Sequence, residues 1–336
     1  MKAAVLREIN APLSVEDVEL TPLQPGQVLV KVFVSGLCGA QLHEISGHKG
    51  NAKFLPHLMG HEGCGIVDEI GDGVTTVKVG DKVVMHWRKS EGIEAPFPKY
   101  ILDGKEISSG KVTTLSEYSI VSENRLTTVP HDASDFLCAL LGCGMTTALG
   151  TINNDAKLRF GESILIVGCG GVGLNLIQGA VLASAHPIVA IDINETKANI
   201  AKSVGATAFT TSIESIEQQS FDVIIDTTGN IDVIKSTIPL LADAGRYILV
   251  GQPKPGESIQ IPDGVSLWSQ SGKSILVSQG GCTKPQEDIP RYVKMHKAGI
   301  LNIDSIITHV FELDDVNKAF DVLKAGEAGR IMVKMI

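Results

Sequence analysis

Short apolar runs rich in β-branched residues, separated by glycine and proline, fill the first third of the chain. Runs of this length bounded by turn residues predict β-strands at 28–34, 65–71 and 80–85. Strands spaced in this way are typical of a partly open barrel or a sandwich rather than a parallel sheet. The stretch 88–112 is polar, is broken by Pro96, Pro98 and Gly104, and has no clear period. It predicts a long surface loop or a small lobe.

The pattern changes near Ser163. The continuous apolar run 164–167 predicts a strand buried on both faces, and it leads directly into Gly-Cys-Gly-Gly-Val-Gly at 168–173. Helix-compatible sequence follows, and a second apolar run at 188–191 ends in Asp192. Strand, Gly-x-Gly-x-x-Gly, helix, strand and acid together form a dinucleotide-binding fingerprint in its proper context.

Each glycine of this loop has a physical role. Gly168 allows the tight turn, Gly170 lets the backbone approach a pyrophosphate, and Gly173 lets the helix pack on the strand. Gly171 and Val172 open the helix, whose N-terminus supplies amide donors and positive potential to the phosphates.

Asp192 lies 19 residues after Gly173, where an acid accepts hydrogen bonds from ribose hydroxyls. Its negative charge would repel a 2′-phosphate, and no Arg or Lys follows in Ile193, Asn194 and Glu195. The sequence therefore favours NAD(H) over NADP(H).

Apolar strands continue to alternate with helical stretches beyond this unit. A helix is predicted at 197–204, and strands at 221–226 and 245–251. Such alternation predicts a parallel, doubly wound sheet, and we expect this domain to span 146–281. Two further helices are predicted, one beginning at 289 and an amphipathic one at 313–323.

Composition narrows the class of protein. The 336 residues are 43% hydrophobic and 20% charged, and 29 Lys and Arg against 38 Asp and Glu give a net charge of −9. An acidic chain without a basic run offers no electrostatic footprint for nucleic acid or an anionic membrane. No apolar stretch reaches the roughly 18 residues of a membrane span, and early charges argue against a secretory signal.

The cysteines and one histidine motif are the candidates for metal chemistry. Six widely spaced cysteines do not form a disulfide framework, so we expect a reducing, cytoplasmic compartment: Cys38, Cys64, Cys138, Cys143, Cys169 and Cys282. Each cysteine taken singly is equally a small buried hydrophobe. Zinc prefers thiolate and imidazole ligands, but Cys38 and His61 alone are a weak signal, because their flanking glycines also suit tight turns.

Five motifs in the same order carry a family resemblance: Gly36–Gly39, Gly60–Gly63, Leu141–Gly144, Gly168–Gly173 and Gly326–Arg330. With them the chain resembles, nearly end to end, the zinc-dependent medium-chain dehydrogenase/reductase family of alcohol and polyol dehydrogenases. The resemblance implies an α/β protein with a GroES-like, partly open β-barrel catalytic domain at 1–145 and 282–336. The Rossmann, doubly wound parallel-sheet cofactor domain at 146–281 lies between these segments.

The resemblance also assigns roles to single residues. Cys38, His61 and Cys143 would hold a catalytic zinc, and Glu62 would be the nearby carboxylate. Asp192 and Lys197 would contact the adenosine ribose, Thr147 would lie near the nicotinamide, and Arg330 near the pyrophosphate. His43 would be the outer end of a proton relay. Trp87 would line the substrate pocket, although ordinary packing explains it equally well.

Departures from the family pattern matter as well. The family often has a second, structural zinc held by four cysteines, but no cysteine lies between Met85 and Leu137, so we expect one zinc per chain. Ala40 stands where the family usually has a relay Ser or Thr, and it has no hydroxyl to pass a proton. Gln41 replaces a common Asp, which would weaken the orientation of His61.

The functional hypothesis is a zinc-dependent oxidoreductase that transfers a hydride between an alcohol, polyol or sugar-derived hydroxyl, or the matching carbonyl, and NAD(H). Zinc would act as the Lewis acid, and the cofactor would carry the hydride in a cleft between the domains. The alternatives are a non-catalytic cofactor-binding protein and a zinc-free quinone or enone reductase. Family members assemble as dimers or tetramers, so a homodimer or homotetramer is expected.

Overall fold

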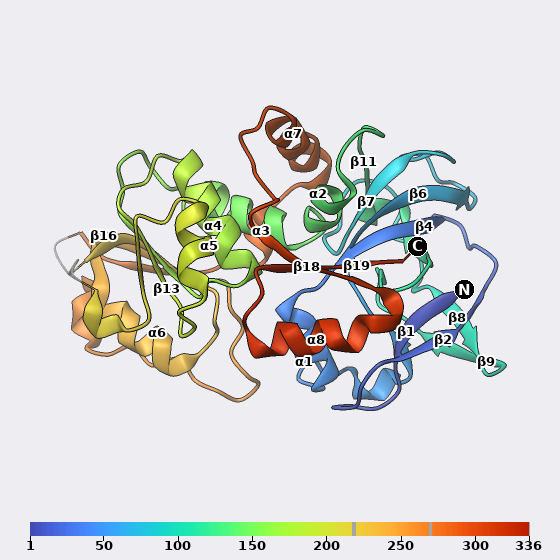
Figure 1. Ribbon diagram of the computed structural model, residues 1–336, viewed down its shortest axis with the longest axis horizontal. Helices are drawn as coiled ribbons and strands as arrows, with labels where there is room; N and C mark the ends of the chain where they lie inside the picture. The colour runs from blue at the N-terminus through green and yellow to red at the C-terminus, as the bar shows by residue number, and fades with distance from the viewer. Residues whose placement is uncertain (217–219, 269–270, 336) are drawn as a thin grey trace. The chain divides into compact units, whose positions relative to one another are not determined.

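The structure is a computed structural model that describes residues 1–216, 220–268 and 271–335 (Figure 1). It divides into two compact units. The first joins both ends of the chain, Met1–Thr146 and Lys284–Ile336, and the second is Thr147–Thr283. No helix among the described residues is long and apolar enough to cross a membrane.

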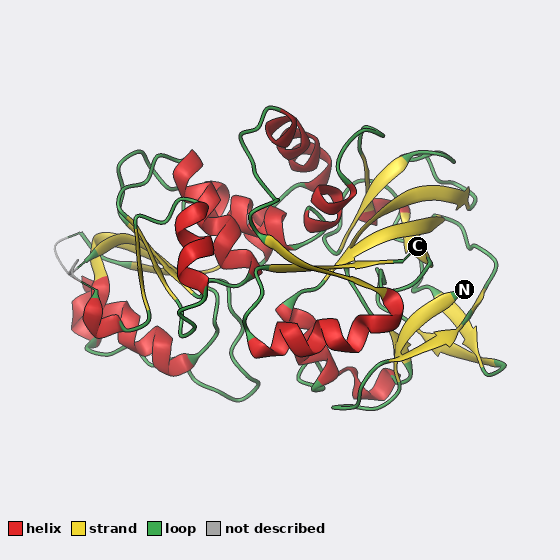
Figure 2. Cartoon of the chain, in the orientation of Figure 1, coloured by secondary structure: helices red, strands yellow, loops and turns green. Residues whose placement is uncertain are grey.

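The first unit is mainly β-structure (Figure 2). Its strands are β1 (Lys2–Leu6), β2 (Ser14–Asp17), β3 (Glu19–Leu20), β4 (Gln27–Gly36), β5 (His57–Leu58), β6 (Glu62–Ile70), β7 (Lys82–His86), β8 (Lys99–Leu102), β9 (Lys105–Ser108), β10 (Tyr118–Ser122), β11 (Leu126–Thr128), β18 (Ile307–Glu312) and β19 (Arg330–Lys334). Its helices are α1 (Gly39–Ile45), α2 (Asp135–Leu140), α7 (Pro285–Lys297) and α8 (Val316–Ala325), with short 3₁₀ turns at Asn51–Phe54, Glu123–Arg125 and Leu313–Asp315.

Two sheets are formed by the described strands of this unit, in the orders β2-β1-β5-β9-β8-β3 and β11-β7-β6-β4-β19-β18, and β10 also pairs with β4. The second sheet packs its apolar side chains against α8, so that Val30, Val67 and Met85 share one buried core with Val316 and Phe320. This mixed sheet agrees with the predicted GroES-like barrel.

The stretch 88–112, predicted to be a long surface loop or a small lobe, contains β8 and β9, an antiparallel hairpin with Leu102 opposite Lys105. The two residues between them, Asp103 and Gly104, both have positive φ, of 52° and 70°. An Asp-Gly pair in this conformation makes the two-residue turn that matches strand twist. The signal was present in the sequence and was masked by the nearby prolines.

The lobe before this hairpin is ordered by carboxylates. Glu94 lies 3.0 Å from Arg125 and 3.1 Å from Lys111. Glu123 accepts backbone hydrogen bonds from Thr75, Thr76 and Ile93 at 2.7–3.0 Å and is fully buried. Charge-assisted hydrogen bonds therefore hold this segment to the barrel.

The second unit is a parallel sheet in the order β14-β13-β12-β15-β16-β17 among the described residues. Its strands are β12 (Ile164–Val167), β13 (Ile188–Ile191), β14 (Ala208–Thr210), β15 (Phe221–Asp226), β16 (Leu241–Leu249) and β17 (Ser274–Val277). Its helices are α4 (Gly171–Leu182), α5 (Lys197–Ser203) and α6 (Ile231–Thr237), with a π-helical turn at Thr151–Asp155 and short 3₁₀ turns at Ile213–Ser215, Ile238–Leu240, Gly264–Trp268 and Gly280–Cys282. Helix α3 (Gly144–Gly150) runs across the boundary between the units.

The order of these strands confirms the predicted doubly wound sheet. The four residues of β12 are all buried, as expected for a strand paired on both sides, with β13 and β15. Figure 1 shows α4 and α5 on one face of the sheet and α6 on the other. The carboxyl end of β12 therefore leads into the glycine-rich loop at the centre of the sheet, where such folds bind nucleotides.

Candidate metal centre and cofactor-binding loop

Strand pairing brings the candidate metal ligands together. β4 and β6 are antiparallel with Ser35 opposite Gly63, so the end of β4 adjoins the start of β6. Cys38 follows β4 as the N-cap of α1, and His61 directly precedes β6. Cys143 lies in the short segment between α2 and α3. The chain therefore delivers three ligands from three distant segments to one point.

The geometry of this cluster fits zinc. One ligand atom from each of Cys38, His61 and Cys143 lies within 4.8 Å of the other two, and no other group of three such residues occurs among the described residues. Ligands of one tetrahedral zinc lie roughly 3.4–3.8 Å apart, given metal–ligand bonds of about 2.0–2.3 Å. Two thiolates and one imidazole leave the fourth position for a water or a substrate.

The three side chains of the cluster shift one another's pKa values. Hydrogen bonding from Cys143 and then from His61 lowers the pKa of Cys38, although burial opposes this. The hydrogen bond to Cys38, together with burial, raises the pKa of Cys143. Burial lowers the pKa of His61, but its hydrogen bond to Cys38 and the charges of Cys38 and Glu62 outweigh this, so the net change is upward. The three side chains thus share protons, and a metal ion bound by two thiolates and a neutral imidazole would displace them.

Glu62 does not join the ligand set. Its Oε1 is paired with Arg330 Nη2, and its Oε2 accepts a hydrogen bond of 2.9 Å from the Gly144 amide. Glu62 is 0% exposed and Arg330 2%. Burial raises the pKa of Glu62, while the Arg330 charge lowers it. Arg330 is positioned by β19, which pairs with β4 so that Met332 lies opposite Gly36.

The glycines beside the ligands make room for this ion pair. A Cβ on Gly36 would lie 2.6 Å from Glu62 Oε1, and one on Gly144 would lie 2.9 Å from Arg330 Nη1. Larger residues would displace the pair. Gly36, one of the glycines that flank Cys38, and Gly144, beside Cys143, therefore pack against the carboxylate and guanidinium beside the cluster.

Helix α1 carries three residues that the sequence singled out. Ala40 is half-buried and offers no hydrogen-bonding group. Gln41 is fully buried, and its Oε1 accepts a 2.8 Å hydrogen bond from the Cys38 amide, while its Nε2 has no partner. His43 is half-buried, and its ring lies 5.9 Å from that of His48.

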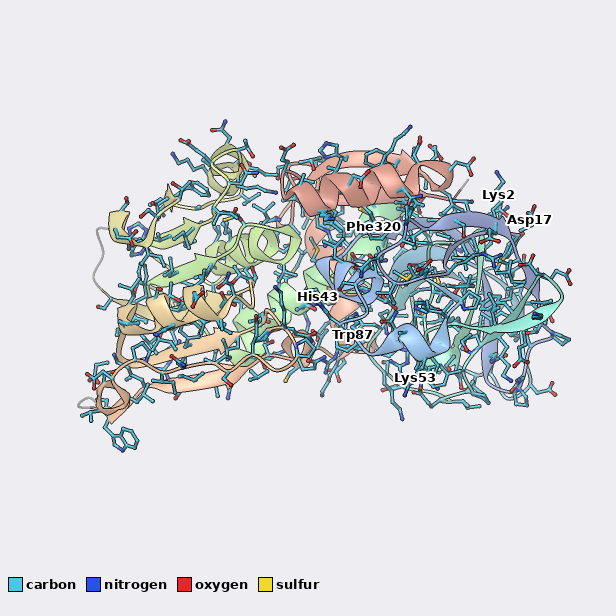
Figure 3. The ribbon with its side chains drawn as sticks, turned by 90° about the horizontal axis from the view of Figure 1, so that it is seen from below. Lys2, Asp17, His43, Lys53, Trp87 and Phe320 are labelled. Atoms are coloured by element: carbon cyan, nitrogen blue, oxygen red, sulfur yellow. The ribbon has the colours of Figure 1, made fainter. Side chains whose placement is uncertain are left out.

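Trp87 directly follows β7, whose last residue, His86, lies opposite Glu62. The ladder ends at this pair, so Trp87 follows β7 at the end of the strand pair where His61 precedes β6. Figure 3 shows Trp87 and His43 in the same part of the first unit. The Arg88 guanidinium lies 5.4 Å from the indole centroid, a cation–π contact. Arg125 donates a hydrogen bond to the Trp87 carbonyl.

The glycine-rich loop has the shape that the sequence predicts. Gly168 has φ +91°, and a Cβ on Gly173 would lie only 1.9 Å from the Gly168 carbonyl oxygen, so neither position accepts a side chain without strain. Gly170 is the N-cap of α4, and Gly171 and Val172 are its first residues. The first-turn amides of α4 therefore have no intrahelical acceptor and remain for a phosphate.

The remaining predicted cofactor contacts lie in the second unit. Asp192 Oδ2 accepts a 2.7 Å hydrogen bond from the Cys169 amide, and Oδ1 accepts one of 2.9 Å from Asn194, which fixes the carboxylate at the end of β13. Lys197 opens α5 and is only 2% exposed. Thr147 is 8% exposed on α3, and its carbonyl accepts a hydrogen bond from Thr151.

Known proteins resemble the chain along its whole length. The family described as "Alcohol dehydrogenase GroES-like domain" matches residues 24–131, and "Zinc-binding dehydrogenase" matches 171–298. A probable S-(hydroxymethyl)glutathione dehydrogenase 1 of Schizosaccharomyces pombe is 31% identical, covering 99% of this chain and 97% of its own. Alcohol dehydrogenase 6 of Peromyscus maniculatus is 33% identical, with the same coverage.

Solved structures give the same result. An alcohol dehydrogenase zinc-binding domain protein from Burkholderia ambifaria aligns with a TM-score of 0.92 at 26% identity, over 100% of this chain and 98% of its own. Benzyl alcohol dehydrogenase from Acinetobacter calcoaceticus aligns with a TM-score of 0.89 at 26% identity, over 100% and 99%. The fold, the cluster and these matches place the chain in the zinc-dependent medium-chain dehydrogenase/reductase family.

Proposed function

We propose that this protein is a zinc-dependent alcohol dehydrogenase that transfers a hydride between the hydroxyl-bearing carbon of an alcohol, polyol or sugar-derived substrate and NAD(H). The observation that carries the proposal is the meeting of Cys38, His61 and Cys143 in a chain that also has a complete dinucleotide loop. Relatives named as alcohol and S-(hydroxymethyl)glutathione dehydrogenases support the same chemistry. A zinc-free reductase would have no need of the three converging ligands.

Each unit has one task in this proposal. Cys38, His61 and Cys143 in the first unit hold the ion, and zinc, when bound, supplies Lewis acidity at the substrate oxygen. Glu62 stays paired with Arg330, which keeps an unneutralised carboxylate away from the ligands. The loop 168–173 and Asp192 in the second unit bind the cofactor.

Arg330 has a second role in the proposal. Its Nε is buried and has no partner within the described chain, whereas its Nη2 is paired with Glu62. A buried donor without an acceptor is costly, and an oxygen of the cofactor pyrophosphate would satisfy it. Thr147 and Lys197 are the further residues for which we propose cofactor contacts, near the nicotinamide and the adenosine ribose.

The proton released by the substrate hydroxyl must leave the site by a route that does not use a side-chain hydroxyl at position 40, because the residue there is Ala40. We propose that His43, on the same helix, accepts it and passes it to water, because an imidazole changes protonation near neutral pH. Trp87 is proposed to form a wall of the substrate pocket, since it follows His86, which pairs with Glu62, the residue after His61. If Ala40→Thr raised activity without moving the pH profile of turnover, a dedicated route around Ala40 would be wrong.

We further propose one zinc per chain and NAD(H) in preference to NADP(H). No cysteine lies between Met85 and Leu137, and the lobe there is held by Glu94 and Glu123. The carboxylate of Asp192 accepts hydrogen bonds from the Cys169 and Asn194 amides, and its negative charge would repel a 2′-phosphate bound beside it. None of the six cysteines, all of which lie among the described residues, forms a disulfide, which supports the proposal of a reducing, cytoplasmic location.

Self-association through the second unit is proposed as well. β17 is an edge strand of the parallel sheet, and its residues Leu276 and Val277 are 41% and 76% exposed. Val265 and Trp268, in the turn before it, are each 78% exposed. An exposed apolar edge is a template for pairing with a second copy of the chain, which supports a homodimer or a homotetramer built from it.

The test is NADH formation by purified protein on a panel of primary alcohols, secondary alcohols and polyols. Activity should disappear after chelation and return on adding zinc, and NADP⁺ should be the poorer acceptor. Reduction of quinones or enones that survives chelation would instead support the zinc-free alternative. Cofactor binding with no turnover of any alcohol or carbonyl would support the non-catalytic one.

A further inference from the structure

The peptide group that joins Cys143 to Gly144 is held at both of its polar atoms. Its carbonyl oxygen accepts a 3.0 Å hydrogen bond from the Thr146 hydroxyl, and its amide donates a 2.9 Å hydrogen bond to Glu62 Oε2. Because a peptide group is planar, fixing both polar atoms fixes the orientation of the whole plane. The Cys143 side chain leaves the backbone at the edge of this plane, so the two hydrogen bonds restrict the direction of its sulfur.

Glu62 packs against Cys143 from both sides along the chain. Gly142 directly precedes Cys143, and a Cβ added to it would lie 2.7 Å from Glu62 Cα and 2.9 Å from Glu62 Cβ. Gly144 directly follows Cys143 and donates its amide to the carboxylate. Glu62 is 0% exposed, and a hydrogen bond to an ionised acceptor is stronger than one to a neutral acceptor. One buried side chain therefore fixes both neighbours of a candidate metal ligand.

The second oxygen of Glu62 is held as well. Oε1 is paired with Arg330 Nη2, and the Arg330 side chain is only 3% exposed. A guanidinium and a backbone amide both donate and neither accepts, so the Glu62 side chain must offer two acceptor oxygens. A carboxylate meets this need, whereas the amide of a glutamine would turn a donor towards one of the two.

The other cysteine of the cluster is held by a neutral side chain. The Cys38 amide donates a 2.8 Å hydrogen bond to Gln41 Oε1, and the Cys38 carbonyl accepts one of 2.9 Å from the Gln41 amide. Gln41, like Glu62, is 0% exposed. A buried side chain thus fixes backbone groups beside each cysteine of the cluster.

We propose that Glu62 is a positioning residue for the metal ligand Cys143. Its Oε2 holds the Gly144 amide, and its pairing with Arg330 turns that oxygen towards the amide. The inference rests on the proposed function, because it concerns the zinc ion that this function requires. Glu62 then acts on the metal through the backbone of Cys143 rather than by contact. Zinc affinity therefore depends on the hydrogen bond to Gly144 and not on the ion pair.

Two double variants separate the Gly144 contact from the ion pair. Glu62→Gln/Arg330→Met and Glu62→Met/Arg330→Met both remove the two buried charges, and glutamine and methionine are similar in length. In the first variant the glutamine oxygen has no guanidinium to meet and can accept from the Gly144 amide. Methionine offers at most a weak acceptor there. Glu69→Gln is the control, because Glu69 is an exposed acid on the same strand, β6.

Zinc affinity is measured on zinc-loaded protein by competition with a chromophoric chelator. Glu62→Met/Arg330→Met should bind zinc at least about tenfold more weakly than Glu62→Gln/Arg330→Met, the effect typical of removing a partner of a metal ligand. Glu62→Gln/Arg330→Met and Glu69→Gln should stay close to the wild type. Equal zinc affinities of the two double variants would overturn the proposal, because the Gly144 contact would then have no influence on the metal.

Cobalt gives a readout of the ligand geometry that is independent of both affinity and turnover. Cobalt(II) binds the same nitrogen and sulfur ligands as zinc, and its thiolate charge-transfer absorption depends on the direction and length of each Co–S bond. Cobalt-loaded Glu62→Gln/Arg330→Met should reproduce the wild-type spectrum, and Glu62→Met/Arg330→Met should show a shifted or weaker charge-transfer band. Identical spectra for all of these proteins would contradict a positioning role for Glu62.

The same measurements distinguish failure of the inference from failure of the proposed function. If the wild type binds no zinc and oxidises no alcohol, the proposed function fails. If the wild type binds zinc and oxidises alcohols but the two double variants have equal zinc affinities, the inference fails and the proposed function stands.

Discussion

Glu62 and Arg330 form a buried ion pair beside the three candidate zinc ligands, although 268 residues separate them along the chain. The pair joins β6 to β19, the strand that returns from the C-terminal segment. The ion pair therefore links the C-terminal strand of the first unit to Glu62, the residue that directly follows His61. Removing one partner of a fully buried ion pair strongly destabilises the fold, because the other charge is left buried and uncompensated.

We expect Arg330→Met to lower the free energy of unfolding by about 3–5 kcal/mol, because it leaves the Glu62 carboxylate buried without its partner. The double variant Glu62→Gln/Arg330→Met should recover part of that loss. Chemical denaturation of the two single variants and the double variant measures the coupling. Lys318→Met, which removes an exposed pair with Asp315, is the control and should have no measurable effect. Equal decreases in the free energy of unfolding for Arg330→Met and Lys318→Met would show that the buried ion pair contributes no more to stability than the exposed one.

Glu94 should make the stability of the lobe depend on pH in the acidic range. Burial alone would raise its pKa, but hydrogen bonds from Arg125, Lys111 and Asn124 lower it to about 2 from an ordinary 4.5. The stabilisation is therefore fully present above pH 4.5 and is lost as the pH falls towards 2, and solvent screening of this exposed residue keeps the loss to about 1 kcal/mol. Unfolding free energies of wild type and Glu94→Gln should converge over this range. Glu106→Gln, at an exposed pair with Lys99, should stay parallel to the wild type.

His86 should make the free energy of unfolding depend on pH in a higher range than Glu94 does. Its Nδ1 donates a 2.7 Å hydrogen bond to the Arg88 carbonyl, and its Nε2 lies 2.9 Å from the Thr127 hydroxyl. Burial lowers its pKa from 6.5 to about 4. The folded state thus binds the proton less tightly than the unfolded state, so stability is full above pH 6.5 and falls by up to about 3 kcal/mol towards pH 4. His86→Gln should flatten this part of the pH profile of unfolding. The exposed His131→Gln should not, and an unchanged slope in His86→Gln would refute the assignment.

Asp192 should determine the choice of cofactor. Removing its carboxylate in Asp192→Ala removes a ribose acceptor and the repulsion of a 2′-phosphate. We expect the kcat/KM preference for NAD⁺ over NADP⁺ to fall roughly tenfold, the size of one charge interaction in a partly buried site. The exposed Asp232→Ala, on α6 in the same unit, is the control. A preference unaltered by Asp192→Ala would place cofactor selection elsewhere.

The sequence predicted the second unit well because its signals are local. A fully apolar strand, a glycine loop and an acid at the end of the next strand lie within one stretch of chain, and their geometry follows from strand and helix periods. Gly173 is the clearest case, since its closeness to the Gly168 carbonyl is a contact within one turn.

The metal cluster required more than local signals. Cys38 and His61 were ambiguous alone, and only the resemblance to a family joined them to Cys143. The pairing of Glu62 with Arg330, and the space that Gly36 provides for it, depend on strands far apart in the sequence. No period or motif within a single segment encodes such a contact.

The lobe at 88–112 contains a hairpin that was not predicted, for a different reason. Its hairpin lies at short strands of four residues each, and the turn signal of Asp103 and Gly104 was outweighed by Pro96 and Pro98. Its ordering by Glu94 and Arg125 depends on side chains 31 residues apart.

The zinc content of the purified protein tests the central claim most directly. Elemental analysis should find one zinc per chain in the wild type and in Cys138→Ala, which alters a buried cysteine outside the cluster, and almost none in Cys143→Ala. Two tightly bound zinc ions per chain, or one that Cys143→Ala retains, would contradict the account of a single site built by Cys38, His61 and Cys143.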